Sequence, residues 1–251
     1  MKLSAAVITF NEEPNIGRFL ENISDLADEI IVVDSFSADR TREIAEKFPK
    51  VSFIQNHFEG FGKQKNFALS HCSGEWILFL DTDEIPDETA KNAIRKVLRE
   101  GSETDVFLLG FNNIFLGKNV RFGGWGNVYR ERFFRKNAGN FDDAYVHEKF
   151  LTNGKVSVLP GKINHFTYRD IHHHIEKSNK YTSMMAQKMS DNGKKSSIGK
   201  IIFSPLFQFL KLYFFKMGFR DGLVGFYAAI TAAFYTFLKY IKLHELQNRQ
   251  S

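Results

Sequence analysis

The stretch Trp76-Ile77-Leu78-Phe79-Leu80-Asp81-Thr82-Asp83-Glu84 joins a continuous apolar run to a cluster of acids. A short apolar run bounded by polar residues is typical of a strand that is buried on both faces. Such strands occur in parallel sheets covered by helices, and these sheets bind ligands at the carboxyl ends of their strands. The stretch therefore predicts an α/β protein with a functional site where residues 76–80 end.

The segments before and after this stretch alternate between strand and helix patterns. We expect strands at 3–10, 29–34, 51–55 and 75–80, and helices at 14–24, 41–47, 63–71 and 88–100. Alternation of this kind indicates βαβ units and a mostly parallel sheet flanked by helices. Asn11, Asp34 and Asp81 each follow a predicted strand, so we expect all three at one edge of the sheet.

The rest of the chain changes character twice. Residues 105–170 are irregular and rich in strand patterns, and from about 171 the pattern becomes helical. We therefore expect a catalytic domain at 1–170, with halves at 1–104 and 105–170, and a helical tail at 171–251. Among the 251 residues, 43% are hydrophobic and one is Cys, which excludes collagen-like, disulfide-scaffold and wholly disordered classes.

The basic charge is concentrated in the tail. From Lys194 onward nine Lys and Arg face only Asp221 and Glu245, a net charge of +7, so residues 1–193 carry −2 of the total +5. Many of the 27 Phe also lie in this part of the chain. Basic residues interleaved with aromatic ones favour an anionic membrane surface over nucleic acid.

The tail has two uncharged runs, 201–210 and 222–238. The second has 17 residues, slightly fewer than the 20 or so that a spanning helix needs. We therefore expect C-terminal amphipathic helices that lie in the membrane interface. The alternatives are a solvated helical face, a helical interface of a homo-oligomer, and a hairpin that crosses the bilayer.

Three groups of polar residues are suited to nucleotide chemistry. Asp81 and Asp83, two positions apart at a strand end, can share a hard cation such as Mg²⁺ or Mn²⁺; the alternative is a polar turn with helix-capping acids. Asp34 at a strand end can accept a hydrogen bond from a base or ribose. At a predicted helix start, side chains suited to phosphate or a base edge are Lys63, Lys65 and Asn66.

Four motifs in order carry a resemblance to glycosyltransferase family 2, whose members are inverting, nucleotide-sugar-dependent enzymes of GT-A fold. They are Val7-Ile8-Thr9-Phe10-Asn11-Glu12, Val33-Asp34-Ser35-Phe36-Ser37-Ala38-Asp39-Arg40-Thr41, Lys65-Asn66-Phe67-Ala68-Leu69 and Leu80-Asp81-Thr82-Asp83-Glu84. The resemblance covers about residues 1–150. Lys65 stands where the family usually has Arg, which keeps the charge but loses the bidentate fork.

The resemblance implies a role for each matched residue. Asn11 and Glu12 would lie near the nucleotide, Asp34 would bind the uracil or ribose, and Lys65 would face the base or pyrophosphate. Asp81 and Asp83 would form the Asp-x-Asp motif, with Asp83 the direct metal ligand. Further along, Arg132 and Arg135 flank Phe133-Phe134 and are candidates to hold the leaving diphosphate or an anionic acceptor.

An inverting transfer needs a general base, which the family places downstream of the Asp-x-Asp motif. Glu148 is the leading candidate, with Asp142 and Asp143 next; the alternative is that Glu148 only pairs with Lys149 or a nearby Arg. Candidates for acceptor binding are Trp125, His147 and Tyr168. The stretch His165-Phe166-Thr167-Tyr168-Arg169, followed by Lys177 and Tyr181, is similar to the lipopolysaccharide-core glucosyltransferase branch.

These observations predict a bacterial enzyme at the cytoplasmic face of the inner membrane. It would move a hexose, with glucose favoured, from a UDP-sugar to a hydroxyl of a lipid-linked glycan such as lipopolysaccharide core. The alternatives are a polyprenyl-phosphate or other cell-envelope transferase and a non-catalytic UDP-binding scaffold. A nucleotidyltransferase would carry a Gly-rich basic loop after its first strand, where this chain has Asn11-Glu12-Glu13-Pro14.

Overall fold

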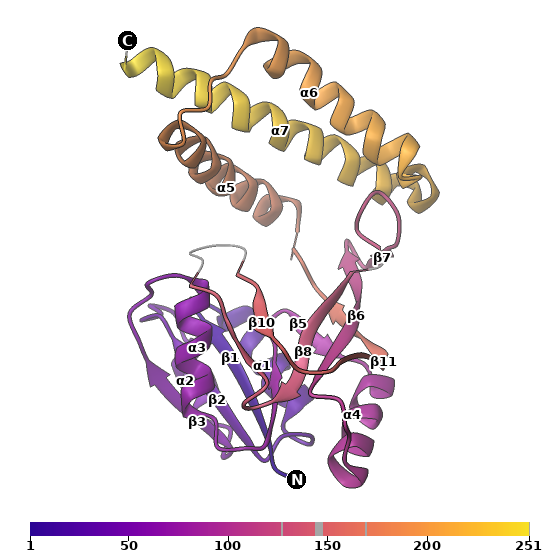
Figure 1. The fold of residues 1–251 in the computed structure, drawn as a ribbon. Helices are drawn as coiled ribbons and strands as arrows, with labels where there is room; N and C mark the ends of the chain where they lie inside the picture. The colour runs from indigo at the N-terminus through magenta and orange to yellow at the C-terminus, as the bar shows by residue number, and fades with distance from the viewer. Residues whose placement is uncertain (127, 144–147, 169, 251) are drawn as a thin grey trace. The chain divides into compact units, whose positions relative to one another are not determined.

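The computed structural model describes residues 1–126, 128–143, 148–168 and 170–250 (Figure 1). The chain divides into two compact units. The first, called the α/β unit, comprises Met1–Phe111 and Val128–His165. The second, called the helical unit, comprises Asn112–Asn127 and Phe166–Ser251. The sequence predicted a single boundary near residue 170 and gave no sign that a segment before residue 128 belongs with the helices.

The α/β unit begins with the predicted alternation of strands and helices. Its first elements are β1 (Leu3–Thr9), α1 (Glu13–Ile23), β2 (Glu29–Asp34), α2 (Thr41–Ala45), β3 (Val51–Gln55), α3 (Phe61–His71), β4 (Trp76–Phe79), β5 (Glu84–Pro86) and α4 (Glu88–Glu100). The predicted helices and strands of this region are confirmed, and their ends differ from prediction by no more than two residues. The sequence patterns did not predict the short strand β5, because its first residue, Glu84, belongs to the acidic motif.

Strands supply most of the rest of the α/β unit. They are β6 (Val106–Phe115), β8 (Tyr129–Arg135), β9 (Gly139–Phe141), β10 (Phe150–Thr152) and β11 (Val156–His165). The large sheet has the order β3-β2-β1-β4-β8-β6-β11-β5, and β7 (Lys118–Val120), in the helical unit, pairs with β6. Strands β1 to β4 are mutually parallel, whereas β8 joins β4 antiparallel. The parallel half therefore presents the ends of β1, β2 and β4 along one edge.

Apolar side chains on alternate strand positions fix how the sheet is covered. On one face, a buried cluster joins Ile31, Val33, Ile77 and Phe79 of the strands to Leu69 of α3. The intervening strand residues, such as Val32 and Leu78, are also fully buried, as are Ile16, Phe19, Leu20 and Ile23 of α1. Burying one such side chain contributes roughly 1.5–3 kcal/mol, so the sheet is held firmly from both faces.

The helical unit contains three long helices. They are α5 (Ile171–Asp191), α6 (Ile198–Leu210) and α7 (Gly222–Gln250), with the short turns η1 (Lys211–Phe215) and η2 (Gly218–Asp221) between the last two. Helix α7 packs against both α5 and α6. The Lys242 ammonium on α7 donates to the Asn179 carbonyl on α5 at 2.7 Å. The prediction that the chain becomes helical from about residue 171 is confirmed.

The segment 112–126 of the helical unit, which contains the end of β6 and all of β7, is joined to η2 and α7 by hydrogen bonds and apolar contacts. The Asp221 carboxylate accepts from the N–H groups of Arg121 and Phe122 at 3.0 and 2.8 Å. Phe115 and Val120 are buried against Val224 of α7. A charged acceptor and a small apolar cluster thus fix a segment whose sequence carries no helical pattern.

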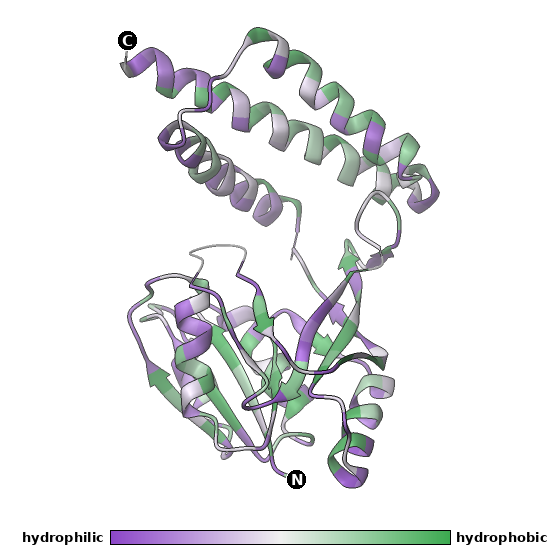
Figure 2. Cartoon of the chain, viewed as in Figure 1, coloured by the Kyte–Doolittle hydropathy of each residue, from purple (hydrophilic) through white to green (hydrophobic). Residues whose placement is uncertain are grey.

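Helices α6 and α7 are markedly apolar (Figure 2). Two segments, Ile198–Phe215 and Gly218–Arg249, are long and apolar enough to cross a membrane by length and composition, each with a mean hydropathy of 1.3. Of the residues in the tested windows, 11% and 28% are buried inside the protein, and Phe203, Phe215 and Leu223 are among the large apolar side chains with more than half of their area exposed.

Candidate active site

Asp34, at the end of β2, is fully buried and tightly held. Its carboxylate accepts from the Thr9 hydroxyl at 3.0 Å and from the Ser37 N–H at 2.8 Å. The Ser37 hydroxyl also donates to it. This carboxylate is therefore fixed in position before any ligand arrives.

Asn11 and Glu12 form the turn after β1. Asn11 has a backbone φ of 55°, and its side-chain oxygen accepts from the Ala38 N–H at 2.9 Å. The Glu12 N–H donates to the Thr41 hydroxyl at 2.8 Å. These bonds join the loops after β1 and β2, so the two motifs that the sequence analysis assigned to the nucleotide form one structural element.

Asp81 lies between two cations at the end of β4. Lys65 Nζ is 3.4 Å from its Oδ1, and Arg132 NH2 is 3.1 Å from its Oδ2. Lys65 on α3 and Arg132 on β8 are almost completely buried, at 3% and 5% exposure. The same Arg132 atom lies 2.6 Å from Oε1 of the buried Glu84. The fold thus brings three separate sequence motifs into one charged cluster.

The environment shifts the pKa values of this cluster in opposite directions. Burial alone would raise the pKa of Asp81, but Lys65 and Arg132 outweigh burial and hold that pKa well below its usual range. Burial raises the pKa of Glu84 even though Arg132 contacts it. Burial would lower the pKa of Arg132, but Glu84 and Asp81 raise it above its ordinary value. Asp81 is therefore anionic across the physiological pH range.

Glu148 joins the same cluster through Lys65. Its Oε1 lies 2.7 Å from Lys65 Nζ, and its side chain is 15% exposed. Of the other two candidate bases, Asp142 accepts from the Lys149 N–H at 3.1 Å, and Asp143 is exposed. The ion-pair partner of Glu148 is thus Lys65 rather than Lys149, and Arg132 also interacts with it electrostatically. The assignment of Glu148 as the base stays a prediction.

Gly62 allows the segment that leads to Glu148 to pack against α3. A Cβ at this position would lie 1.7 Å from the carbonyl oxygen of Asp142. That distance is far below any van der Waals contact, so only glycine fits. The Asn66 amide holds the same segment, because it donates to the Phe141 carbonyl at 2.8 Å and accepts from the Phe141 N–H at 2.9 Å.

Asp83 forms an ion pair with His165, which belongs to the last strand of the α/β unit. Its Oδ2 lies 3.4 Å from Nε2 of His165, at the end of β11. Burial would lower the pKa of His165, but Asp83 raises it above its ordinary value. No cluster of three or more His, Cys, Asp or Glu with metal-binding geometry occurs in the described part of the chain. Asp83 and His165 are the residues that could offer one oxygen and one nitrogen ligand to a divalent cation here.

Two of the sequence expectations need correction. Arg135 pairs across the sheet with Trp76, at the opposite end of β4 from Asp81, donates to the Ser102 carbonyl and pairs with Asp105. It is therefore too far along the strand to hold a diphosphate beside Arg132. Asn66 braces the backbone of Phe141, so the structure assigns it to the fold rather than to the nucleotide.

The remaining expected residues are placed as follows. Lys63 is exposed and pairs with Glu59 at 3.0 Å, on the surface of α3. Trp125 and Tyr168 belong to the helical unit, where their rings lie 6.4 Å apart. His147 lies outside the described residues. Trp125 and Tyr168 thus share a unit with each other but not with the acid cluster.

Sequence analysis did not assign Glu84 or His165 to the site. Glu84 was visible as the fourth residue of the acidic motif, and its burial beside Arg132 depends on β8, which is more than 40 residues away in the chain. The sequence analysis grouped His165 with the residues that follow it and did not connect it to Asp83. The pairing of β11 with β5, which sets His165 opposite Glu84, is a tertiary feature that no local pattern reveals.

Removing the buried cation of the cluster should destabilise the fold. Replacing Arg132 by Met leaves Glu84 buried without its partner, and breaking a buried pair costs about 3–5 kcal/mol. We expect a loss of that size in urea unfolding followed by tryptophan fluorescence. Arg130→Met, an exposed change on the same strand, should cost less than about 1 kcal/mol. Adding Glu84→Gln to Arg132→Met should recover part of the loss; equal stabilities of Arg132→Met and wild type would contradict this account.

The protein is thus of the α/β class, with a cluster of charged side chains at the carboxyl ends of its parallel strands, where such sheets bind ligands. Residues 4–157 match the family model described as glycosyl transferase family 2. The chain therefore belongs to glycosyltransferase family 2, as the four sequence motifs predicted. It is a glycosyltransferase.

Relatives match along nearly the whole chain. The lipopolysaccharide core biosynthesis glycosyltransferase LpsC of Rhizobium meliloti is 31% identical, over 98% of this chain and 93% of its own. An uncharacterized glycosyltransferase of Rickettsia conorii is 28% identical over 97% and 90%. The crystal structure of Staphylococcus aureus TarS 1–349 is similar with a TM-score of 0.50 and 20% identity, and covers 100% of this chain and 92% of that one. This likeness confirms the predicted GT-A type of fold.

Proposed function

We propose that this glycosyltransferase transfers a hexose from a UDP-sugar to a hydroxyl of a lipid-linked glycan, with inversion at the anomeric carbon. The proposal rests chiefly on one observation: Lys65 and Arg132 place Asp81 and Glu148 in one cluster at the carboxyl end of β4, beside Asp83. Asp34 lies at the end of β2 on the same sheet edge. A nucleotide, a diphosphate and an acceptor hydroxyl each have a suitable partner there.

The donor half of the site is supported by the fixed carboxylate of Asp34. A carboxylate can accept hydrogen bonds from a uracil N–H or a ribose hydroxyl. Because Asp34 is fully buried and already accepts from Thr9 and Ser37, the nucleoside would have to displace the Ser37 turn to reach it. TarS, which has a similar fold, has been crystallised with UDP and with UDP-GlcNAc. On that basis we propose that this chain also binds UDP. We assign the loops of Asn11, Glu12 and Asp34 to the nucleoside.

The diphosphate half of the site contains both positive and negative groups. Asp83 and His165 would hold Mg²⁺ or Mn²⁺, which when bound neutralises charge on the departing diphosphate. Arg132 and Lys65 fix the carboxylate of Asp81 from two sides. We assign Asp81 to the orientation of this region, because two protein cations already compensate its charge.

Glu148 would act as the general base. The acceptor oxygen attacks the anomeric carbon and forms the new glycosidic bond, while the bond from that carbon to the phosphate oxygen breaks and UDP leaves with the electron pair. Glu148 takes the proton from the acceptor hydroxyl. One displacement without an enzyme-bound intermediate inverts the configuration.

The acceptor assignment is supported by the relatives and by the helical unit. LpsC takes part in lipopolysaccharide core biosynthesis, as its name says. An acceptor of that chemistry stays in a leaflet, so the enzyme must work at a membrane surface. We propose glucose as the sugar and the cytoplasmic face of a bacterial inner membrane as the location.

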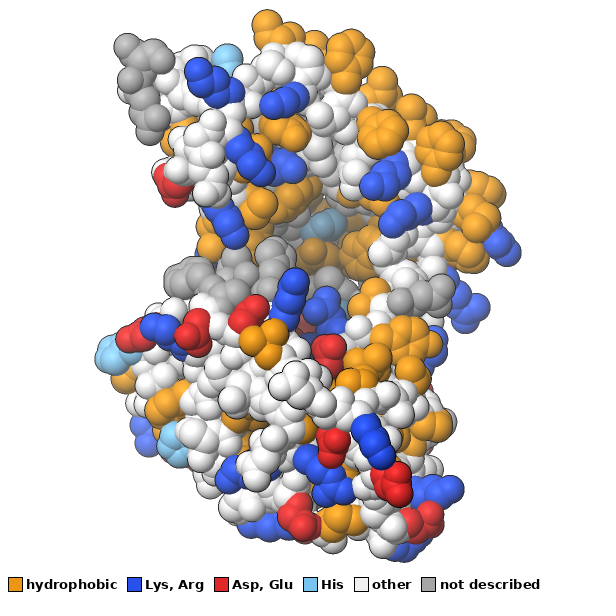
Figure 3. Space-filling view, viewed as in Figure 1, with side chains coloured by type: hydrophobic (Ala, Val, Ile, Leu, Met, Phe, Trp, Pro, Cys, Tyr) orange, Lys and Arg blue, Asp and Glu red, His pale blue; other side chains and the backbone are white. Residues whose placement is uncertain are grey.

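The helical unit has an exposed apolar surface suited to that location. Large apolar side chains with more than half of their area exposed, called the apolar surface here, are Ile198, Ile202, Phe203, Leu206, Phe207, Phe214, Phe215 and Leu223. In Figure 3, Lys and Arg side chains lie between hydrophobic side chains on the visible face. Apolar groups that enter the interface, with cations at the headgroups, favour a monotopic attachment.

Two substitutions in the apolar surface should release the protein from vesicles. Phe215 is 76% exposed and Leu223 is 79% exposed. Each inserted side chain contributes at least about 1.5 kcal/mol, so Phe215→Ser with Leu223→Ser should weaken binding to anionic vesicles about a hundredfold in co-sedimentation. The matched control, Val156→Ser with Val158→Ser, removes exposed apolar residues from the α/β unit and should have little effect. Unchanged binding by the first pair would exclude this attachment surface.

The proposed reaction is tested by measuring UDP release from a panel of UDP-sugars. The purified protein is incubated with and without Mn²⁺ and with a crude lipid-glycan extract. We expect release that needs the metal, favours UDP-glucose and rises with the extract. UDP binding without release under any condition would support the scaffold alternative, and no UDP binding would overturn the donor assignment.

A further inference from the structure

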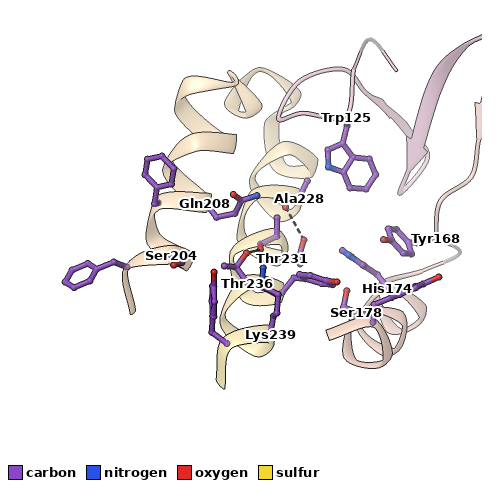
Figure 4. Close-up of a pocket in the computed structure, with 16 residues that line it drawn as sticks. Trp125, Tyr168, His174, Ser178, Ser204, Gln208, Ala228, Thr231, Thr236 and Lys239 are labelled. Atoms are coloured by element: carbon purple, nitrogen blue, oxygen red, sulfur yellow. Dashed lines mark hydrogen bonds between the residues drawn. The ribbon is translucent and has the colours of Figure 1, made fainter. Parts of the chain in front are cut away.

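The helical unit contains a cavity of about 750 Å³ to which the proposed reaction assigns no role (Figure 4). Its walls come from helices α5, α6 and α7 and from two residues outside them, Trp125 and Tyr168. A volume of this size is typical of small-molecule sites. The cavity lies wholly within the helical unit, so its shape is set by the packing of these helices.

One part of the cavity wall is aromatic and polar. Tyr168 stacks on His174 with ring centroids 4.1 Å apart, and Trp125 lies 6.4 Å from Tyr168. An aromatic ring such as that of Trp125 can stack on the C–H face of a sugar, and hydroxyl groups such as that of Tyr168 bind sugar hydroxyls. Hydroxyl and amide side chains in the wall are Ser178, Ser204, Gln208, Thr231 and Thr236.

The charge of the cavity wall selects for an anion. The described lining residues include Lys239 and contain no Asp or Glu. Lys239 Nζ lies 4.9 Å from the ring centroid of Tyr240, so the cation is held beside an aromatic face. Burial lowers the pKa of His174 to about 4, so this imidazole is neutral near pH 7. Lys239 is thus the cation of the described wall at that pH.

Another part of the wall belongs to the apolar surface. Phe203 and Phe207 on α6 line the cavity and are 67% and 62% exposed. The same two side chains therefore border both the cavity and the surface that we assign to the membrane. A ligand held there would be polar at one end and continuous with lipid at the other.

We propose that this cavity binds the junction between sugar and lipid in an anionic glycolipid, with its phosphate at Lys239, its sugar at Trp125 and Tyr168, and its acyl chains at Phe203 and Phe207. The identity of the glycolipid as the acceptor rests on the proposed function. The inference assigns acceptor binding to the helical unit, whereas the donor and the base belong to the α/β unit. Trp125 and Tyr168, which the sequence singled out separately, contribute to the same wall.

The experiment measures binding of the full chain to three kinds of phosphatidylcholine vesicle. One carries 5 mol% monophosphoryl lipid A, one carries phosphatidylglycerol at equal surface charge, and one carries uncharged glucosylceramide. Two variants change the cavity: Ser204→Trp fills it and Lys239→Gln removes its cation. Their matched controls are Ser190→Trp and Lys188→Gln, the same changes on α5 at residues that neither line the cavity nor belong to the apolar surface.

We expect at least tenfold tighter binding to the lipid A vesicles than to either other kind. Both cavity variants should lose that preference and bind the phosphatidylglycerol vesicles as the wild type does, whereas both controls should retain it. Equal binding of the wild type to the lipid A and phosphatidylglycerol vesicles would overturn the proposal, as would cavity variants that keep the preference. UDP binding, measured on the same samples, reports on the proposed function separately, because the cavity variants leave the α/β unit unchanged.

Discussion

Replacing Glu148 by Gln should lower turnover about 10²- to 10⁴-fold and leave the affinity for UDP within about threefold of the wild type. The amide keeps the size of the side chain but cannot take a proton from the acceptor hydroxyl. Its partner Lys65, at 2.7 Å, remains available to Asp81. Turnover is measured as UDP release with saturating acceptor, and UDP affinity by calorimetry.

The matched control for this variant is Asp143→Asn, which removes the same charge from an exposed acid earlier in the same segment. Its turnover should stay within about threefold of the wild type. A small effect at Glu148 together with a large one at Asp143 or Asp142 would move the base to that residue. A parallel loss of UDP affinity in the Glu148 variant would instead indicate that Glu148 supports the donor pocket.

Replacing Asp83 by Asn should abolish metal-dependent turnover, with a loss of at least about a hundredfold and an intact fold. The change removes the carboxylate that lies 3.4 Å from His165, and a metal that stabilises transition-state charge contributes several kcal/mol, or more than two factors of ten. Activity is followed during titration with Mn²⁺. The wild type should respond to the metal and the variant should stay flat.

Glu88→Gln is the matched control, because Glu88 is 74% exposed on α4 and carries the same charge. It should keep both the activity and the response to Mn²⁺. A variant at Asp83 that retains full metal-dependent activity would contradict the metal assignment. Circular dichroism spectra of the two variants should coincide, since neither change removes a buried side chain.

Local sequence patterns were sufficient to predict the helices and the parallel strands of the first hundred residues, although not the short strand β5. Continuous apolar runs such as Trp76–Leu80 bury both faces of a strand, and the amphipathic segments between them have a helical period, so local patterns were sufficient. The four ordered motifs were also local, and they identified the family. Asp34, Asp81 and Asp83 were predicted at strand ends because a parallel sheet places such ends along one edge.

The contacts between these side chains depend on how distant segments pack, which no local pattern predicts. The partners of Asp81 come from α3 and β8, and the partner of Asp83 comes from the end of β11. Arg132 and Arg135 look alike in sequence but lie at different distances from Asp81 along β8. Arg132 forms a buried ion pair with Asp81, whereas Arg135 pairs with Asp105 far from it. The antiparallel register of β8 on β4 makes that difference, and register depends on pairing across many residues rather than on the residues of either strand.

The helical unit follows the same rule. Composition alone predicted apolar, basic helices at the C-terminus, because hydropathy and charge are properties of the residues themselves. The cavity, by contrast, exists only because α5, α6 and α7 pack together around Trp125 and Tyr168. Those two residues are more than 40 positions apart, and each is contributed by a segment without helical pattern. Hydropathy, charge and local motifs belong to single residues or short segments, so they could be predicted from the sequence. The cavity and the ion pairs need several distant segments to pack together, so they could not.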